Sequence, residues 1–139
     1  VESFENAFEE FGLEKIKTVG DAIVAVAGLS SHSISPVKSC VDCSYKLREI
    51  ASSASMPWDL HLGIHSGSLV AGTVGTKTVQ FDILGKTVNV AFNICDMSVS
   101  NQILISSDAW MTARNEIKVK SIGLKRLKSG QDIEMLECV

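Results

Sequence analysis

Residues 81–96 read FDILGKTVNVAFNICD, a short apolar run that breaks at Gly85 and continues with helical spacing. Beyond the break, apolar side chains recur at i, i+3, i+4 and i+7, which predicts the buried stripe of a helix: Val88, Ala91, Phe92 and Cys95. A polar stripe runs beside it: Asn89, Asn93 and Asp96. A solvated helix face normally carries Lys and Glu, so this polar stripe indicates directional hydrogen bonding. An ordinary amphipathic helix is the alternative that this segment alone leaves open.

The bulk composition fits one domain spanning residues 1–139. Apolar residues make up 45% of the chain, and 13 basic against 16 acidic residues leave a net charge of −3. This balance creates no strong field for nucleic acid or an anionic membrane. No apolar run approaches the ~20 residues of a membrane span, and no secretory signal opens the chain. We therefore expect a cytoplasmic domain without membrane insertion. Because the chain opens inside an expected helix, we expect it to be the cytosolic part of a larger protein.

The cysteines include one C-x-x-C pair, Cys40 and Cys43, within an expected helix. A structural zinc site needs two further ligands at suitable spacing, and the sequence has neither a second C-x-x-C nor paired histidines. We expect reduced, partly buried thiols, with metal or redox chemistry as the alternative.

Turn signals and periodicity predict an α+β chain. Gly20-Asp21 and Gly75-Thr76-Lys77 are the expected turns of two hairpins. The order of elements favours helices packed on one face of a largely antiparallel sheet. The expected helices cover 1–11, 36–52, the residues after Gly85, and 107–114; the expected strands cover 13–19, 22–27, 58–65, 69–74, 79–84, 102–106, 117–122, 124–127 and 133–138.

Three segments together resemble the class III adenylate and guanylate cyclases: EKIKTVGDAIVAVAGL at 14–29, HLGIHSGSLVAGTVG at 61–75 and FDILGKTVNVAFN at 81–93. The resemblance covers nearly the whole chain from Gly12 onward. It implies a ferredoxin-like core and a head-to-tail dimer with active sites at the interface, formed by a homodimer or with another cyclase domain. It also implies conversion of a nucleoside triphosphate to its 3′,5′-cyclic monophosphate and pyrophosphate.

Asp21 is the expected metal ligand. On a tight turn after Gly20, its carboxylate stands clear of its own sheet. Mg²⁺ is typically bound by one or two carboxylates together with substrate phosphates, and the reaction needs Mg²⁺ or Mn²⁺. The alternative is that Asp occupies this turn for backbone reasons alone.

Lys17 and Asp82 match the base-reading pair of the family. A lysine donates to the ring nitrogen of adenine, and a carboxylate accepts from its exocyclic amine. Guanylate members typically place Glu and Cys at these positions, so the resemblance favours ATP over GTP. The alternative for Lys17 is a solvated strand lysine like Lys15, which alternation places on the same strand face.

The resemblance gives Asn89 the role of orienting the ribose and Lys128 that of contacting the terminal phosphates. Asn93 is a departure, because it stands where the family has a transition-state arginine. Losing one preorganised donor to a developing oxyanion costs about 10²- to 10³-fold in rate. A second departure is the absence, within residues 1–139, of the family's first strand with its other metal-binding aspartate.

Other chemistry is disfavoured. The chain has no P-loop and no G-x-S-x-G elbow, and His61 and His65 lack an arranged nucleophile. Two hypotheses follow. The first is an adenylate cyclase; the second is a catalytically degenerate cyclase-fold module that binds nucleotide or dimerises. A guanylate cyclase is a third and weaker possibility.

Overall fold

The computed structural model describes residues 2–28, 35–54, 57, 59–67, 70–73, 81–84 and 86–139, without the side chains of residues 2, 17, 70–73 and 81–84. Its helices are α1 (Glu2–Glu10), α2 (Pro36–Ser53), α3 (Lys86–Met97) and α4 (Ser107–Met111). Its strands are β1 (Glu14–Val19), β2 (Ala22–Val26), β3 (His61–Ile64), β4 (Val70–Thr73), β5 (Phe81–Leu84), β6 (Gln102–Ser106), β7 (Val119–Arg126) and β8 (Asp132–Cys138). None of the helices in these ranges is long and apolar enough to cross a bilayer.

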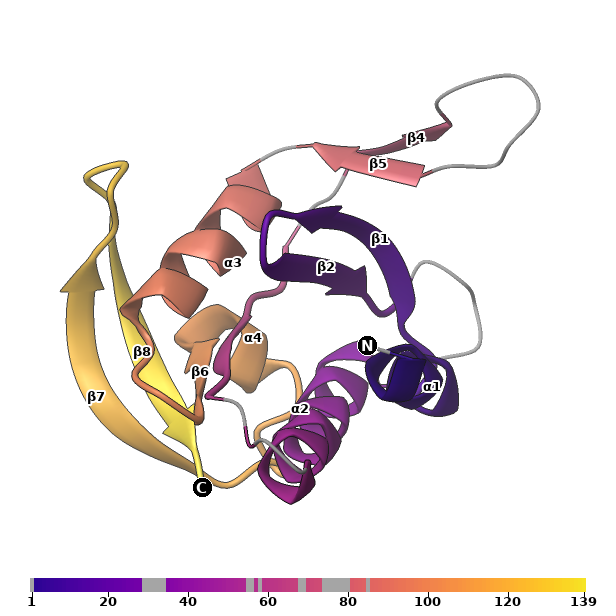
Figure 1. Cartoon of the computed structure of the whole chain (residues 1–139). Helices are drawn as coiled ribbons and strands as arrows, with labels where there is room; N and C mark the ends of the chain where they lie inside the picture. The colour runs from indigo at the N-terminus through magenta and orange to yellow at the C-terminus, as the bar shows by residue number, and fades with distance from the viewer. Residues whose placement is uncertain are drawn as a thin grey trace.

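The central sheet has the strand order β3-β6-β8-β7, and the β1–β2 and β4–β5 hairpins stand apart from it (Figure 1). The pairs β6–β8 and β7–β8 are antiparallel, whereas β3 and β6 are parallel. Parallel neighbours need a crossover connection, and α3 supplies it between β3 and β6. The α+β, ferredoxin-like expectation is confirmed, with this one parallel pair in a largely antiparallel fold.

Helices cover both faces of the central sheet, so the expectation of one covered face was wrong. Strand β6 shows the reason, because its side chains alternate between two apolar clusters. Ile103 and Ile105 pack with residues of α2 and α4, whereas Leu104 packs with Val90 and Ile94 of α3. The helix α3 therefore lies alone on its face of the sheet in the described part of the chain.

The buried side of α3 differs from the predicted apolar stripe. Val88, Val90 and Ile94 are its buried residues, while Phe92 is only partly buried. The stripe prediction missed Val90 and Ile94, because α3 contacts two surfaces: the cluster around Leu104 and the backbone of β3. One helical stripe cannot describe both contacts.

Gly63 is where α3 meets β3 backbone to backbone. A Cβ added at Gly63 would lie 2.5 Å from the Cys95 nitrogen and 2.9 Å from the Ala91 carbonyl oxygen. We expect Gly63→Ala to lower the free energy of unfolding by about 1–3 kcal/mol, since the helix must shift to admit the methyl group. Urea unfolding followed by circular dichroism measures this loss.

Gly67→Ala is the matched control for this substitution. A Cβ at Gly67 would meet the Thr87 Oγ1 atom at 2.7 Å, which is a side-chain atom and not part of the backbone. We therefore expect a smaller loss than at Gly63. Equal unfolding midpoints for the Gly63 variant and the unchanged protein would contradict the close-packing argument.

The C-terminal strands are more continuous than predicted. Gly123 has φ 93° and lies at a bulge, so β7 runs through the position where two strands were expected. Helix α4 begins after Ser106, whose hydroxyl accepts a hydrogen bond from the Ala109 amide and so caps the helix. It ends earlier than predicted, at Met111, where turns follow. The turn expected at residues 75–77 lies outside the described residues.

Cys40 and Cys43 lie on α2 as free thiols. Burial raises the pKa of Cys40 to about 11 and that of Cys43 to about 12, so both thiols are protonated at neutral pH. Among the described residues, no group of three or more metal-ligating side chains occurs. Cys40 is partly buried and Cys43 is buried, in line with the expected partly buried thiols, and the raised pKa values oppose redox reactivity at this pair.

Candidate active site

Helix α3 is flanked by two hairpin turns that carry expected site residues. Figure 1 shows the β1–β2 turn on one side of α3 and the β7–β8 hairpin on the other. Asp21 lies on the first turn, and Lys128 follows β7 in the second. Asn89 and Asn93 lie on α3 itself. Four of the six expected site residues are therefore arranged on and around one helix.

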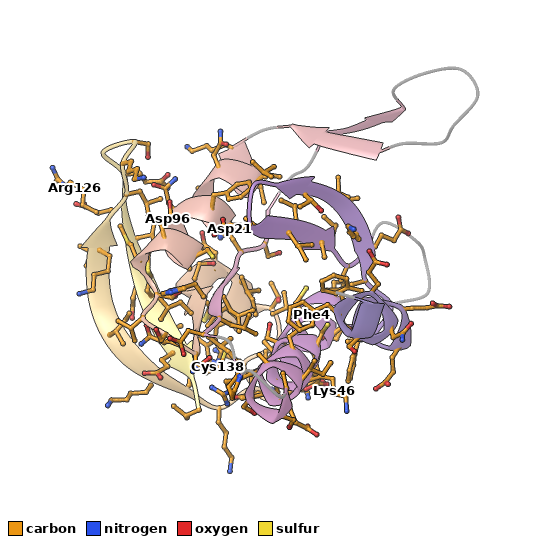
Figure 2. The ribbon with its side chains drawn as sticks, viewed as in Figure 1. Phe4, Asp21, Lys46, Asp96, Arg126 and Cys138 are labelled. Atoms are coloured by element: carbon orange, nitrogen blue, oxygen red, sulfur yellow. The ribbon has the colours of Figure 1, made fainter. Side chains whose placement is uncertain are left out.

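Asp21 projects from a tight turn toward α3. Gly20, at φ 60°, makes the turn, and the Asp21 side chain is exposed (Figure 2). Burial raises the pKa of the Cys95 thiol on α3, and the carboxylates of Asp96 and Asp21 raise it further. The negative charge of Asp21 is thus close enough to α3 to act on Cys95.

The donors at Asp21 fit a magnesium ion that takes its remaining ligands from elsewhere. Mg²⁺ retains several waters and is commonly held by one or two carboxylates plus substrate phosphates. An exposed carboxylate on a turn meets that requirement, because nothing buries it away from a substrate. Among the described residues, Asp21 is a carboxylate that could hold such an ion.

Lys17 lies in β1 and Asp82 in β5, and these two strands contact each other. The side chains of both residues lie outside the described part of the chain. The predicted shared strand face of Lys15 and Lys17 assumed regular alternation along β1. The pairing of β1 with β2 instead shifts register between these two residues. Lys15 instead forms an ion pair with Glu5 of α1, with 2.7 Å between Nζ and Oε1.

Asn93 uses both ends of its amide in hydrogen bonds. Its Nδ2 donates to the Asn89 carbonyl oxygen at 2.7 Å, and its Oδ1 accepts from the Lys128 backbone N–H at 3.1 Å. The Asn89 side chain is exposed on the same helix. The predicted directional hydrogen bonding of the polar stripe is confirmed at Asn93.

Lys128 reaches back to the last turn of α3. Its ammonium lies 3.5 Å from Oδ2 of Asp96, and the two side chains are 79% and 60% exposed. Ion pairs as exposed as this one contribute between about 0 and 1 kcal/mol. Sequence reasoning placed Asp96 in the polar stripe but gave it no partner. The contact crosses 32 positions of the chain, and no local pattern signals it.

A cavity of about 490 Å³ lies between the start of α3 and the start of β8, and it is lined by none of the four expected site residues whose side chains are described. His65 lines it, with Nδ1 2.7 Å from the Ser106 hydroxyl. Burial lowers the pKa of His65, and this effect exceeds the opposite effect of the nearby Asp108 carboxylate, which raises the pKa. His61 Nδ1 lies 2.8 Å from the Ser98 carbonyl oxygen. Each histidine thus has a hydrogen-bond partner within the chain.

The family model of the adenylate and guanylate cyclase catalytic domain matches residues 1–136, and the chain belongs to this family. Among curated relatives, the soluble guanylate cyclase gcy-31 of Caenorhabditis elegans is 30% identical over 139 residues. An adenylate cyclase of Mycobacterium tuberculosis is 26% identical over 136 residues. These alignments cover 96% and 89% of this chain, but only 19% and 31% of the two relatives.

Solved structures confirm the fold. The guanylate cyclase domain of RhGC from Catenaria anguillulae, in complex with GTP, superposes with a TM-score of 0.89 at 19% identity. The adenylyl cyclase CyaB from P. aeruginosa gives 0.85 at 20% identity. The two superpositions include 98% and 99% of this chain, respectively, and 77% of each of the two solved chains. Relatives of both nucleotide preferences therefore share this fold.

Proposed function

We propose that this chain is an adenylate cyclase catalytic domain, which converts ATP to 3′,5′-cyclic AMP and pyrophosphate at the interface of two cyclase domains. The observation that carries the proposal is the arrangement around α3. Asp21, Asn89 and Lys128 come from two hairpin turns and the helix between them. Separately they are ordinary surface residues; together they offer a carboxylate, an amide and an ammonium to one polyphosphate ester.

Each of these groups suits a different part of the substrate. Asn89, exposed on α3, orients the ribose through its side-chain amide. Lys128 meets the terminal phosphates, which leave as pyrophosphate when the ribose 3′-oxygen bonds to the α-phosphorus. Asp21 would hold Mg²⁺ or Mn²⁺, and such an ion would supply charge that activates the attacking hydroxyl and neutralises the phosphates.

The preference for ATP rests on Lys17 and Asp82. Their strands, β1 and β5, contact each other, which supports joint reading of one base edge. A lysine donor with a carboxylate acceptor matches the ring nitrogen and exocyclic amine of adenine. Guanine presents a carbonyl oxygen and a ring N–H at the corresponding edge, so this pair opposes it. The relatives include both kinds of cyclase, and these two side chains are the basis for choosing between them.

A second cyclase domain completes the site in this proposal. The Asn89, Asp96 and Lys128 side chains are exposed in the single chain, so a substrate bound there keeps one side open to solvent. A partner domain, identical or different, closes that side. In this proposal, activity depends on the relative position of the two domains, so a change at their interface would regulate it.

The test is a cyclase assay on the full-length protein with Mg²⁺ or Mn²⁺, with products separated by chromatography. We expect cyclic AMP from ATP and little cyclic GMP from GTP. A preference for GTP would overturn the assignment of the base-reading pair. Absence of both products, in a protein shown to be folded and dimeric, would overturn the enzymatic proposal.

The second candidate is a degenerate cyclase-fold module, and Asn93 is the observation that favours it. Its oxygen and one of its two N–H donors are engaged within the chain, and the amide is neutral and short, so it offers the α-phosphate no positive charge in place of the family arginine. This candidate predicts dimerisation and ATP binding without turnover. Calorimetry with ATP, alongside the cyclase assay, distinguishes the two candidates.

A further inference from the structure

We propose that Asn93 is a positioning residue for Lys128, fixing the backbone of the β7–β8 turn against α3 so that the lysine side chain extends from a fixed point beside this helix. The proposal rests on the proposed function, in which Lys128 meets the terminal phosphates. It gives Asn93 a role different from that of the arginine it replaces. It also predicts that arginine at this position impairs the site.

The amide of Asn93 is oriented by the chemistry of its two partners. The Asn89 carbonyl oxygen can only accept a hydrogen bond, and the Lys128 backbone N–H can only donate one. The Nδ2 atom must therefore face Asn89 and the Oδ1 atom must face Lys128. Donor and acceptor are both required, and a short side chain is required to place them. Asparagine meets all three conditions on this helix.

Two neighbouring contacts define what the Asn93 bond adds. Leu127 is 2% exposed and packs with Val90 and Ile94 of α3, so the residue before Lys128 is already anchored. The turn closes on itself through the Leu127 N–H to the Gln131 carbonyl oxygen at 2.8 Å. The Asn93 bond then ties the Lys128 backbone directly to α3. The start of the lysine side chain is thereby fixed.

The end of the same side chain is held much more weakly. The contact between the Lys128 ammonium and Asp96 spans 3.5 Å between exposed groups, and water competes for both. A triphosphate carries several negative charges and displaces one exposed carboxylate. Lys128 thus combines a fixed backbone with a releasable ammonium. In this arrangement Asp96 holds the ammonium only while the phosphates are absent.

Arginine cannot take over this role. A guanidinium has five N–H donors and no acceptor, so the Lys128 N–H would lose its partner. Aspartate keeps an acceptor oxygen but loses the donor to the Asn89 carbonyl. Alanine removes both groups. The three variants therefore test separately the contributions of the Asn93 acceptor, the Asn93 donor and an added positive charge.

The first readout is amide hydrogen exchange at Lys128, which requires no activity. We expect exchange at that single amide to accelerate at least about tenfold in Asn93→Ala and in Asn93→Arg, and to stay near the wild-type rate in Asn93→Asp. Asn115→Ala, in the turns between α4 and β7, is the matched control and leaves the rate unchanged. Unchanged exchange in Asn93→Ala would overturn the proposal.

The second readout is a double-mutant cycle with Lys128→Ala. If Asn93 acts through Lys128, Asn93→Ala raises the KM for ATP in the wild type but changes it by less than about twofold in the Lys128→Ala background. Equal effects in both backgrounds, or a higher kcat in Asn93→Arg, would overturn the positioning role. Inorganic pyrophosphate binding, measured by calorimetry, gives the same cycle without turnover. A protein with no turnover but a coupled cycle would overturn the enzymatic proposal and retain this one.

Discussion

Replacing Asp21 with alanine is expected to abolish cyclic AMP formation. In the proposed site this carboxylate is the chain's ligand for Mg²⁺ or Mn²⁺, and such an ion supplies several kcal/mol of transition-state stabilisation. Since each 1.36 kcal/mol is a factor of ten, we expect kcat/KM to fall by at least about 10²-fold. The measurement is the initial rate over a range of Mg²⁺ concentrations.

Two features make this substitution a clean test of the metal site. Asp21 is exposed on a turn formed by Gly20, so its removal opens no cavity and the melting temperature is expected to stay constant. Glu116→Ala, which removes an exposed carboxylate outside the α3 region, is the matched control and keeps full activity. Unimpaired turnover in Asp21→Ala would show that the metal is held elsewhere.

Exchanging the base-reading pair is expected to reverse the nucleotide preference. The double variant Lys17→Glu with Asp82→Cys replaces the donor by an acceptor and removes the carboxylate that opposes guanine. Sites that read a substrate by hydrogen bonds discriminate strongly, because a mismatch leaves buried polar groups unpaired. We expect the ratio of kcat/KM for GTP to that for ATP to rise by at least about 10²-fold.

Lys15→Ala is the control for this exchange, because the same strand carries it. Lys15 forms an ion pair with Glu5 of α1. Removing the Lys15 side chain therefore affects the contact between β1 and α1 and is expected to leave the nucleotide preference unchanged. The single variants Lys17→Glu and Asp82→Cys are each expected to weaken ATP use without gaining GTP use. A double variant that kept its preference for ATP would place base recognition on other residues.

Local signals predicted the elements whose ends have clear chemical markers. Helix α2 begins at Pro36 and α4 at Ser107, both at their predicted starts, and Gly20 forms the predicted β1–β2 turn. Strand β6 matches its predicted bounds because a run of β-branched and apolar residues there is flanked by turn and cap residues. These markers act within a few residues, which is the range over which sequence patterns are informative.

The features that sequence missed depend on contacts between distant segments. The parallel pairing of β3 with β6 follows from where α3 crosses, and the burial of Ile94 follows from the sheet face that α3 covers. The family resemblance identified Asn89 and Lys128 one by one. It did not show that Asn93 joins them, because that link needs the β7–β8 turn folded back onto α3.

The backbone contact at Gly63 has a consequence for how a signal reaches the site. Most helices rest on a sheet through side chains, which change rotamer and absorb small displacements. At Gly63 no side chain separates β3 from α3, because the glycine brings the two main chains together. We therefore expect a shift of β3 to displace α3 as well, because the two backbones are in contact at Gly63. Asn89 and Asn93 would move with the helix, and in the proposed function this contact would link the sheet to the nucleotide site.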